Sequence, residues 1–258
     1  MPITAVDAGK SANQSDPYYE DRVNLAAVFR MAARLDMHES VANHFSYAVS
    51  EDGNQFLVNP IGRHFSNIRA SELLLLDAND DSTMNKPNAP DPTAWAIHGA
   101  MHRNVPQARC ILHLHPKYAT VLASIEDQGL PPIDQNTMRY FNRVSLDTGF
   151  DGMGLGDEAE RLTSTMGDNR VLIMGNHGVM VIGNTIARAF DELYYFERAC
   201  STYITALMTG KPLRIVSDEV AEKTAQQWDH FVDNTRYTEA HLREVREILD
   251  REEPDYKL

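Results

Sequence analysis

Apolar residues recur at three- and four-residue steps near the start of the chain. Leu25, Phe29, Ala32 and Leu35 share one face, which predicts an amphipathic helix over residues 20–35. Two β-leaning runs follow in HFSYAVSEDGNQFLVNP, residues 44–60. The Asp-Gly and Gly-Asn pairs between them supply the positive φ angles of a tight turn, so this segment is expected to form a β-hairpin.

The middle of the chain mixes helix and strand patterns. Asp91 and Pro92 suit the N-cap and the first position of a helix that ends before Pro106. The run CILHLH, residues 110–115, predicts a strand, and a short helix is expected after it. GLPP, residues 129–132, indicates the start of an irregular loop region.

The last third of the chain begins with RVLIMGNHGVMVIGNT, residues 170–185. Its two runs rich in β-branched residues flank Gly-Asn-His-Gly, which predicts two strands joined by a tight turn. A long helix is expected from about residue 185 to 208, ended by Gly210. Two charged helices, near 218–233 and 238–252, complete a mixed α and β chain.

Composition narrows the class of protein. With 258 residues and 43% hydrophobic content, the chain can form one large domain with its own core. Its apolar runs are far shorter than the ~20 residues of a membrane helix, so no membrane span is expected. Residues 1–19 are expected to be a flexible leader and not an export signal, which makes the cytoplasm the default location.

Charge and cysteine content exclude further classes. The net charge is −13 and no basic patch stands out, so nucleic acid is not expected as a partner. Cys110 and Cys200 lie in strand-like and helix-like segments without a close partner, which argues against a disulfide or a thiolate metal site.

Three histidines suggest chemistry. Alternate residues of a strand project from one face, so His113 and His115 can reach one ion while Leu114 points into the core. His177, between glycine-flanked positions at a strand end, can be aimed at the same point. Three imidazoles leave coordination positions open, as a catalytic metal needs. Two hydrogen-bonded core histidines remain an equally good interpretation of the His-X-His pair alone.

Other histidines carry weaker signals. His98 and His102 lie four residues apart on the predicted helix, a spacing that also suits a metal, although core and surface histidines are commoner there. His38, His230 and His241 are interpreted as ordinary solvated helix residues.

Together these motifs resemble the class II aldolase/adducin family. HLHP, residues 113–116, and GNHGVMV, residues 175–181, stand where that family has its His-X-His and Asn-His-Gly motifs. VANHFSYAV, residues 41–49, and FLVNPIGRHFSNIRASEL, residues 56–73, extend the resemblance toward its adducin-like branch. The similarity covers about residues 20–215 and leaves 216–258 as a C-terminal helical extension.

The resemblance implies a three-layer α/β/α domain with a mostly antiparallel central sheet. It also implies a homotetramer with active sites at subunit interfaces. In the family's aldolases three histidines hold zinc, which places one divalent ion on His113, His115 and His177, with zinc first and manganese or iron as alternatives. Adducin resembles these enzymes but works in cytoskeletal assembly without the metal, so retention of all three histidines favours an enzyme.

Several positions depart from the family's pattern. The aldolases carry an acidic residue where this chain has Ala94, whose side chain is expected to face the metal and leave a gap for substrate or water. The family's phosphate cradle matches Ala42-Asn43, Ile61-Gly62 and Pro92-Thr93, where several donors are missing. An unphosphorylated oxo- or hydroxy-carboxylate is therefore favoured over a sugar phosphate.

Other site residues follow from the same comparison. Asn43 and Gly62 remain from the cradle, Arg63 could hold a carboxylate through two parallel hydrogen bonds, and His64 lies next to it. A surface role for Arg63 is as reasonable. Tyr140 is a candidate proton donor, because the aldolases use a tyrosine of a neighbouring subunit in this region, and His98 is a candidate helper.

The resulting hypothesis is a metal-dependent carbon–carbon lyase with a small-molecule substrate. A Lewis-acidic metal lowers the cost of forming a carbanion by several kcal/mol. Decarboxylation needs no carboxylate base, whereas a retro-aldol step must remove a hydroxyl proton, so both chemistries stay open. An iron oxygenase on the same fold and a non-enzymatic adducin-like binding protein are the alternatives.

Overall fold

The computed structural model describes residues 16–80, 82–86, 89–152 and 158–258. The first fifteen residues of the expected leader lie outside this part, and Tyr19 already begins a helix. The α-helices are α1 (Tyr19–Arg34), α2 (Pro92–Asn104), α3 (Lys117–Ala123), α4 (Gln135–Arg139), α5 (Glu158–Met166), α6 (Ile186–Met208), α7 (Asp218–Asn234) and α8 (Tyr237–Glu252).

The strands are β1 (His44–Ala48), β2 (Gln55–Val58), β3 (Leu74–Asp77), β4 (Cys110–Leu114), β5 (Val144–Asp147), β6 (Val171–Met174) and β7 (Gly178–Gly183). Short 3₁₀ helices are η1 (Phe65–Asn67), η2 (Ala70–Glu72), η3 (Thr83–Asn85) and η4 (Pro254–Lys257). The predicted helices and the β1–β2 hairpin are confirmed to within a few residues. The irregular region expected after residue 129 contains α4 and β5.

The described strands form one mixed sheet in the order β3-β2-β1-β4-β7-β6-β5. The pairing of β5 with β6 is parallel, and the other five pairings are antiparallel. Strand β4 therefore lies at the centre, between β1 and β7. Its register places His113 opposite His44 on one side and Met180 on the other.

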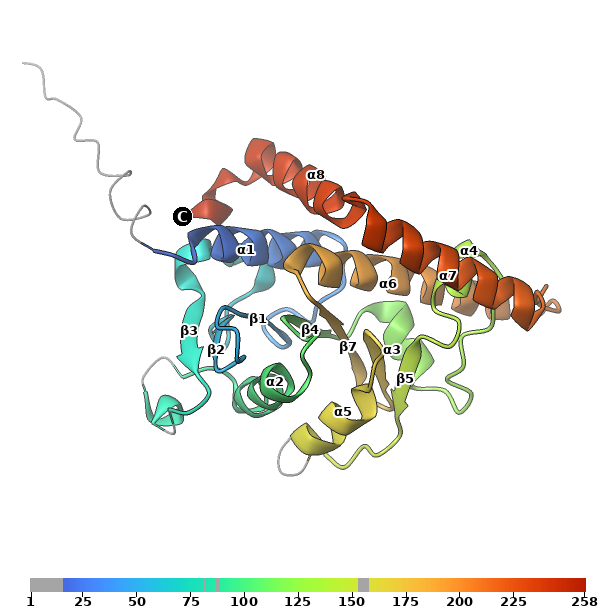
Figure 1. Ribbon diagram of the computed structural model, residues 1–258, viewed down its shortest axis with the longest axis horizontal. Coiled ribbons are helices and arrows are strands. Elements are labelled where there is room, and N and C mark those ends of the chain that lie inside the picture. The colour runs from blue at the N-terminus through green and yellow to red at the C-terminus, as the bar shows by residue number, and fades with distance from the viewer. Residues whose placement is uncertain (1–15, 81, 87–88, 153–157) are drawn as a thin grey trace, which may run out of the picture.

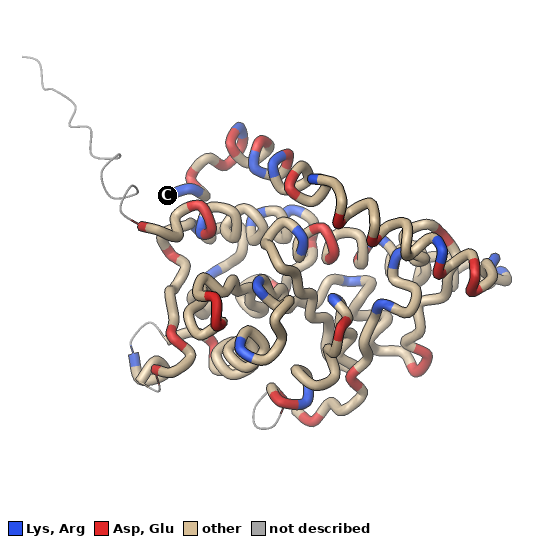
Figure 2. The backbone as a smooth tube through the Cα atoms, viewed as in Figure 1, with Lys and Arg blue, Asp and Glu red and all other residues tan. Residues whose placement is uncertain are grey.

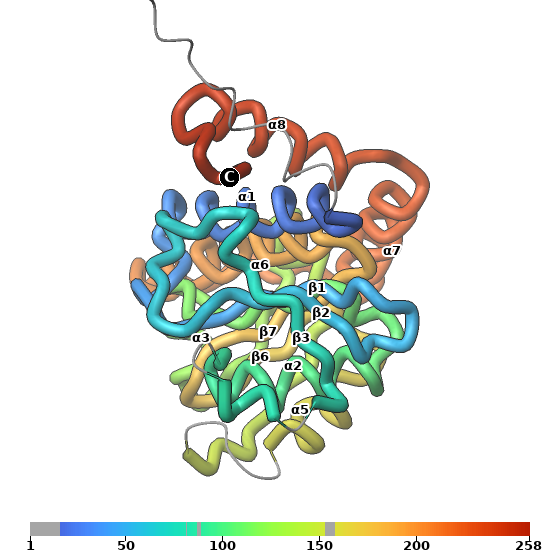
Figure 3. The backbone as a smooth tube through the Cα atoms, turned by 90° about the vertical axis from the view of Figure 1, so that its left-hand side faces the viewer, coloured from blue at the N-terminus to red at the C-terminus, as the bar shows by residue number. Residues whose placement is uncertain are grey.

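Helices cover both faces of the sheet, as Figures 1 and 3 show. On one face, Leu112 and Leu114 of β4 are buried in the core that α1, α3 and α6 share. On the other face, Ile111 joins a second apolar cluster with residues of α2 and α5. Because side chains alternate along a strand, His113 shares the face of Ile111 and points to the side of α2. Leu114 points into the main core, as the sequence predicted.

The C-terminal segment adds a further layer beyond α1 and α6 (Figure 1). Leu242, Leu249 and Tyr256 are buried in the same core cluster as α1 and α6. Arg30 of α1 forms ion pairs with Glu253 and Asp255 of this segment, each with a nitrogen–oxygen distance of 3.1 Å. Helix α8 and the residues after it therefore contribute to the main core.

Charged residues of both signs are interspersed along α8 (Figure 2). Within the described part of the chain, none of the helices combines the length and the apolar character that crossing a membrane requires.

Candidate metal centre

Three structural elements bring the histidines together. His113 lies near the end of β4, His115 follows that strand, and His177 lies in the turn between β6 and β7. In this turn Asn176 has a φ of 58°, a conformation that asparagine tolerates well. The Asn176 amide also donates to the Ala123 carbonyl oxygen of α3 at 2.8 Å, which holds the turn against the sheet.

The three rings face one another. Their ring centroids are 5.2 Å apart for His113 and His115, and 4.9 Å apart for each of these rings and His177. Each ring offers one nitrogen, and the three nitrogens lie within 4.8 Å of one another. Among the residues that the structure describes, this is the group that could hold a metal ion.

Hydrogen bonds orient two of the rings. His113 Nδ1 donates to the Val179 carbonyl oxygen at 3.0 Å, and His115 Nδ1 bonds Glu39 Oε2 at 2.6 Å. Each bond leaves the Nε2 lone pair of its ring free, which is how metal-binding histidines are usually oriented. Glu39 was not singled out in the sequence, because its place beside His115 depends on the fold.

Unpaired buried nitrogens test whether the cluster suits a metal. In the described part of the chain, His115 Nε2 and His177 Nδ1 are buried without a hydrogen-bond partner. Such atoms are rare in folded proteins and need an explanation, which a bound ion would provide. Burial lowers the pKa of His177 to about 4 and that of His113 well below its ordinary value. Both rings are thus neutral at pH 7, the form that binds metal, so the residues fit a divalent cation.

His98 lies behind the cluster instead of in it. Its side chain is fully buried, and its two ring nitrogens contact His44 Nδ1 at 2.8 Å and Ser46 Oγ. It can therefore act on a ligand only through His44, whose ring centroid is 4.9 Å from that of His113. His44 could not be recognised as a neighbour of the cluster from the sequence, because its place opposite His113 depends on the pairing of β1 with β4.

The predicted substrate residues lie in the loops next to β1 and β2. The Asn43 side-chain oxygen accepts from the Glu39 amide at 2.9 Å, so Asn43 holds the loop that carries Glu39. Gly62 has a φ of 72°, and a side chain there would meet nothing within 4 Å. Arg63 pairs with Glu72 at 2.8 Å, and His64 Nε2 lies 3.3 Å from His38 Nε2.

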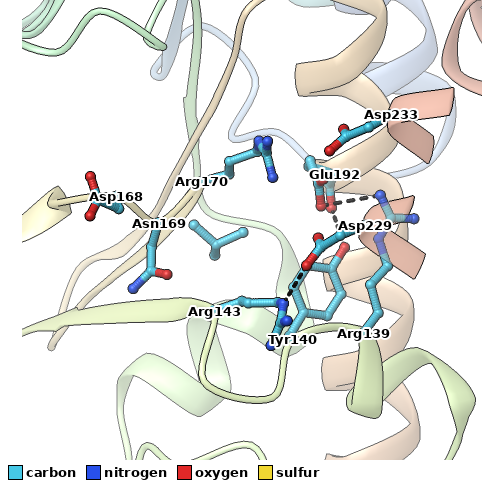
Figure 4. Close-up of a pocket in the computed structure, with 10 residues that line it drawn as sticks. Arg139, Tyr140, Arg143, Asp168, Asn169, Arg170, Glu192, Asp229 and Asp233 are labelled. Atoms are coloured by element: carbon cyan, nitrogen blue, oxygen red, sulfur yellow. Dashed lines mark hydrogen bonds and ion pairs between the residues drawn. The ribbon is translucent and has the colours of Figure 1, made fainter. Parts of the chain in front are cut away.

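Tyr140 does not suit the role of proton donor that was expected from the sequence. Its hydroxyl donates to the Glu192 carbonyl oxygen at 2.8 Å, and its ring packs on Phe196 in the core. It faces a cavity of about 280 Å³ that is lined by ion-paired arginines and carboxylates and includes none of the three histidines (Figure 4). Burial raises the pKa of Tyr140 well above its ordinary value. These contacts leave it unsuited to giving a proton to a ligand.

The expectation that Ala94 faces the metal and leaves a gap for substrate or water is also wrong. Its side chain is 1% exposed and packs with Phe56 and Val58 in an apolar cluster. It therefore fills space between α2 and the sheet and does not leave a gap beside the histidines. His38, expected in a helix, lies in the loop after α1.

The fold and this cluster define an α/β protein with a candidate three-histidine metal centre. Residues 23–204 match the family model described as the class II aldolase and adducin N-terminal domain, and the chain belongs to this family.

Three relatives show the range of the similarity. A crystal structure of an aldolase II superfamily protein from Pseudomonas syringae has 30% sequence identity and a TM-score of 0.86, covering 97% of this chain and 100% of that one. Decarboxylase NovR of Streptomyces niveus is 27% identical over 82% of this chain and 80% of its own length. Adducin-related protein 1 of Caenorhabditis elegans is 30% identical over 79% of this chain but only 28% of its own length.

Proposed function

We propose that this protein is a metal-dependent carbon–carbon lyase acting on a small, unphosphorylated oxo- or hydroxy-carboxylate. The observation that supports it best is the cluster of His113, His115 and His177, with buried nitrogens that lack other partners in the described part of the chain. Zinc is the first candidate for the ion, with manganese and iron as alternatives. When bound, such an ion supplies a Lewis acid that polarises the oxygen beside the breaking bond.

The chain's own residues prepare the site for this chemistry. Val179 and Glu39 hold two rings with Nε2 free, and burial keeps His113 neutral. Asn43 fixes the loop that carries Glu39. The ligands are thus oriented before the ion or the substrate arrives, which reduces the free energy lost on binding.

Decarboxylation is favoured over aldol cleavage. A retro-aldol step needs a base to remove a hydroxyl proton, and position 94, acidic in the aldolases, is a buried alanine here. Loss of CO2 forms the same carbanion without such a base. The similarity to a relative named as a decarboxylase supports this choice.

Metal analysis and product assays test the proposal. We expect about one divalent ion per chain in protein purified without added metal, and CO2 release from members of a panel of 2-oxo and 2-hydroxy acids. His177→Ala should lose both the ion and the activity, whereas His230→Ala, on the exposed surface of α7, should keep both. Aldehyde release would favour the aldolase, and iron with oxygen uptake would favour an oxygenase. A chain without metal or turnover would indicate an adducin-like binding protein.

The active form is proposed to be a homotetramer with sites at subunit interfaces. Exposed apolar side chains at and beyond the end of α6 support an assembly, since Met208 is 79% exposed and Ile215 58% exposed. Light scattering should give four times the chain mass of 29.0 kDa. A single-chain mass at working concentration would contradict this.

A further inference from the structure

Helix α3 connects the two segments that carry the candidate metal ligands. Its N-cap, Pro116, directly follows His115 in the chain. At its other end, the Ala123 carbonyl oxygen accepts from the amide of Asn176, the neighbour of His177, at 2.8 Å. A helix of this length is a rigid rod roughly 10 Å long. A displacement of α3 is therefore passed to the backbone next to both ligands.

The N-terminus of α3 is capped by a residue that is distant in the sequence. The first amides of a helix have no partner within it, and an N-cap side chain usually accepts from the second or the third of them. Pro116 has no side chain that could do this. Glu197 of α6 takes the role instead: its Oε1 accepts from the Tyr118 amide and its Oε2 from the Ala119 amide, each at 2.9 Å. Because backbone amides only donate, the direction of both bonds is fixed by the covalent structure.

These two hydrogen bonds add what the packing of α3 does not provide. Ala119 and Leu122 of α3 are buried in the main core together with Phe196 of α6. Apolar contacts are non-directional, so they hold α3 against α6 without sharply fixing its position along the helix axis. Glu197 is only 8% exposed and accepts one amide on each carboxylate oxygen. Such a pair of directional bonds fixes both the position and the orientation of the first turn of α3.

We propose that Glu197 is a positioning residue of the metal centre. By joining the first turn of α3 to α6, it fixes the backbone next to His115 and, through the bond to Asn176, the backbone next to His177. Metal–ligand distances tolerate only about 0.2 Å, so a small displacement of α3 is enough to weaken metal binding. This role rests on the metal centre of the proposed function and holds whichever reaction that centre performs.

Metal affinity and ligand geometry test this role. Glu197→Gln keeps the shape of the side chain but turns an NH2 group toward one of the two amides, so one hydrogen bond is lost. We expect its zinc affinity, measured by competition with a chromogenic chelator, to fall ~10-fold, the lower end of the effect of residues that orient ligands. The visible absorption of the cobalt(II)-loaded protein, which reports the coordination geometry, should change as well. Glu197→Asp keeps the charge but is one methylene shorter, so it should also lose affinity and replaces Glu197→Gln if that variant does not fold.

Asp191→Asn is the matched control, since it exchanges a buried carboxylate for an amide on the same helix. Asp191 pairs with Arg139 and His241, and neither of these belongs to α3 or to the three-histidine cluster. This variant should keep the zinc affinity and the cobalt spectrum of the wild type although it is less stable. Equal losses of zinc affinity in Asp191→Asn and Glu197→Gln would overturn the proposal, because they would indicate a general effect of lower stability.

Hydrogen–deuterium exchange of the metal-free protein tests the connection through α3. Asn176 bonds the end of α3 that is far from Glu197, so its amide should exchange up to ~10-fold faster in Glu197→Gln, as the weakening of one hydrogen bond allows. The same amide should exchange at the wild-type rate in Asp191→Asn. An unchanged rate in Glu197→Gln would overturn the connection from Glu197 to His177.

The outcomes separate this role from the proposed lyase. Wild-type zinc affinity in both Glu197 variants would overturn the positioning role even if CO2 release were found. A loss of affinity in Glu197→Gln, with the control unchanged, supports the role even if neither CO2 nor aldehyde is released, and then the lyase proposal alone fails. A wild-type protein that binds no zinc would overturn both.

Discussion

A single methyl group at Gly178 should disable the metal centre. Gly178 begins β7 directly after His177, and a Cβ atom there would lie 2.3 Å from His115 Cδ2 and 2.9 Å from the Leu114 carbonyl oxygen. Ordinary van der Waals contacts begin at 3.4 Å. The φ of Gly178 is not in the positive range, so the effect of Gly178→Ala comes from this contact and not from backbone strain.

The size of the effect follows from these distances. The His115 ring must move by about 1 Å to relieve the contact, whereas metal–ligand distances tolerate only about 0.2 Å. The backbone carbonyl on the other side limits how far the methyl group can move instead. We therefore expect zinc affinity to fall by about 100-fold or more, the upper end of what disturbed ligand orientation causes.

Competition with a chromogenic chelator measures this affinity. Gly99→Ala is the matched control, because a Cβ at Gly99 on α2 meets nothing closer than 3.8 Å. That variant should keep wild-type zinc affinity and gain about 0.5–1 kcal/mol of stability from its better helix propensity. If Gly178→Ala binds zinc within about threefold of the wild type while remaining folded, His115 is not a ligand or its orientation does not matter.

Three further predictions concern the groups around this centre and the core. Glu39→Gln should weaken zinc binding by about 10- to 100-fold in the same assay, because Glu39 orients His115; an unchanged affinity would contradict this. Asp191→Asn should lower the free energy of unfolding in urea by about 3–5 kcal/mol, since this fully buried carboxylate accepts from Arg139 and His241. The control Asp233→Asn, at an exposed ion pair, should lower it by under about 1 kcal/mol. Equal losses of stability in the two variants would refute the reasoning. Acid should destabilise the metal-free fold. Burial lowers the pKa of His102 from its ordinary 6.5 to about 3, so between these two pH values only the unfolded chain takes up the proton. The free energy of unfolding should therefore drop by up to about 1.4 kcal/mol per pH unit as the pH falls through this range. Urea unfolding from about pH 7 to about pH 4 should show a shallower loss in His102→Gln, and equal slopes would exclude this residue as a source.

Local patterns in the sequence were enough to predict most helices and the hairpin. The Asp91 cap and the apolar stripe of α2 lie within one helix, and the turn of the hairpin is set by the residues around Gly53, whose φ is 73°. Strands β3 and β5 and helices α4 and α5 were not predicted. None of them is longer than nine residues, so their stability comes from neighbours in the sheet and the core and leaves little pattern in the chain.

The three candidate metal ligands could also be found in the sequence, because His113 and His115 share a strand face and His177 lies in a recognisable turn. The residues that surround these ligands could not be identified from the sequence. Glu39 reaches His115 across 76 positions, and His44 reaches His98 across 54, so neither contact has a local signal. The same holds for Tyr140, whose burial against α6 only the packing of α4 decides.

The sequence alone therefore determined most of the helices, the β1–β2 hairpin, the family and the three histidines, because each depends on residues close together in the chain or on a motif within it. The tertiary structure decided what surrounds them. Pairing of β1 with β4 places His44 beside His113, and the packing of α2 buries Ala94 in an apolar cluster. Strand register and helix packing bring distant residues together through the burial of the whole core, which no short stretch of sequence encodes.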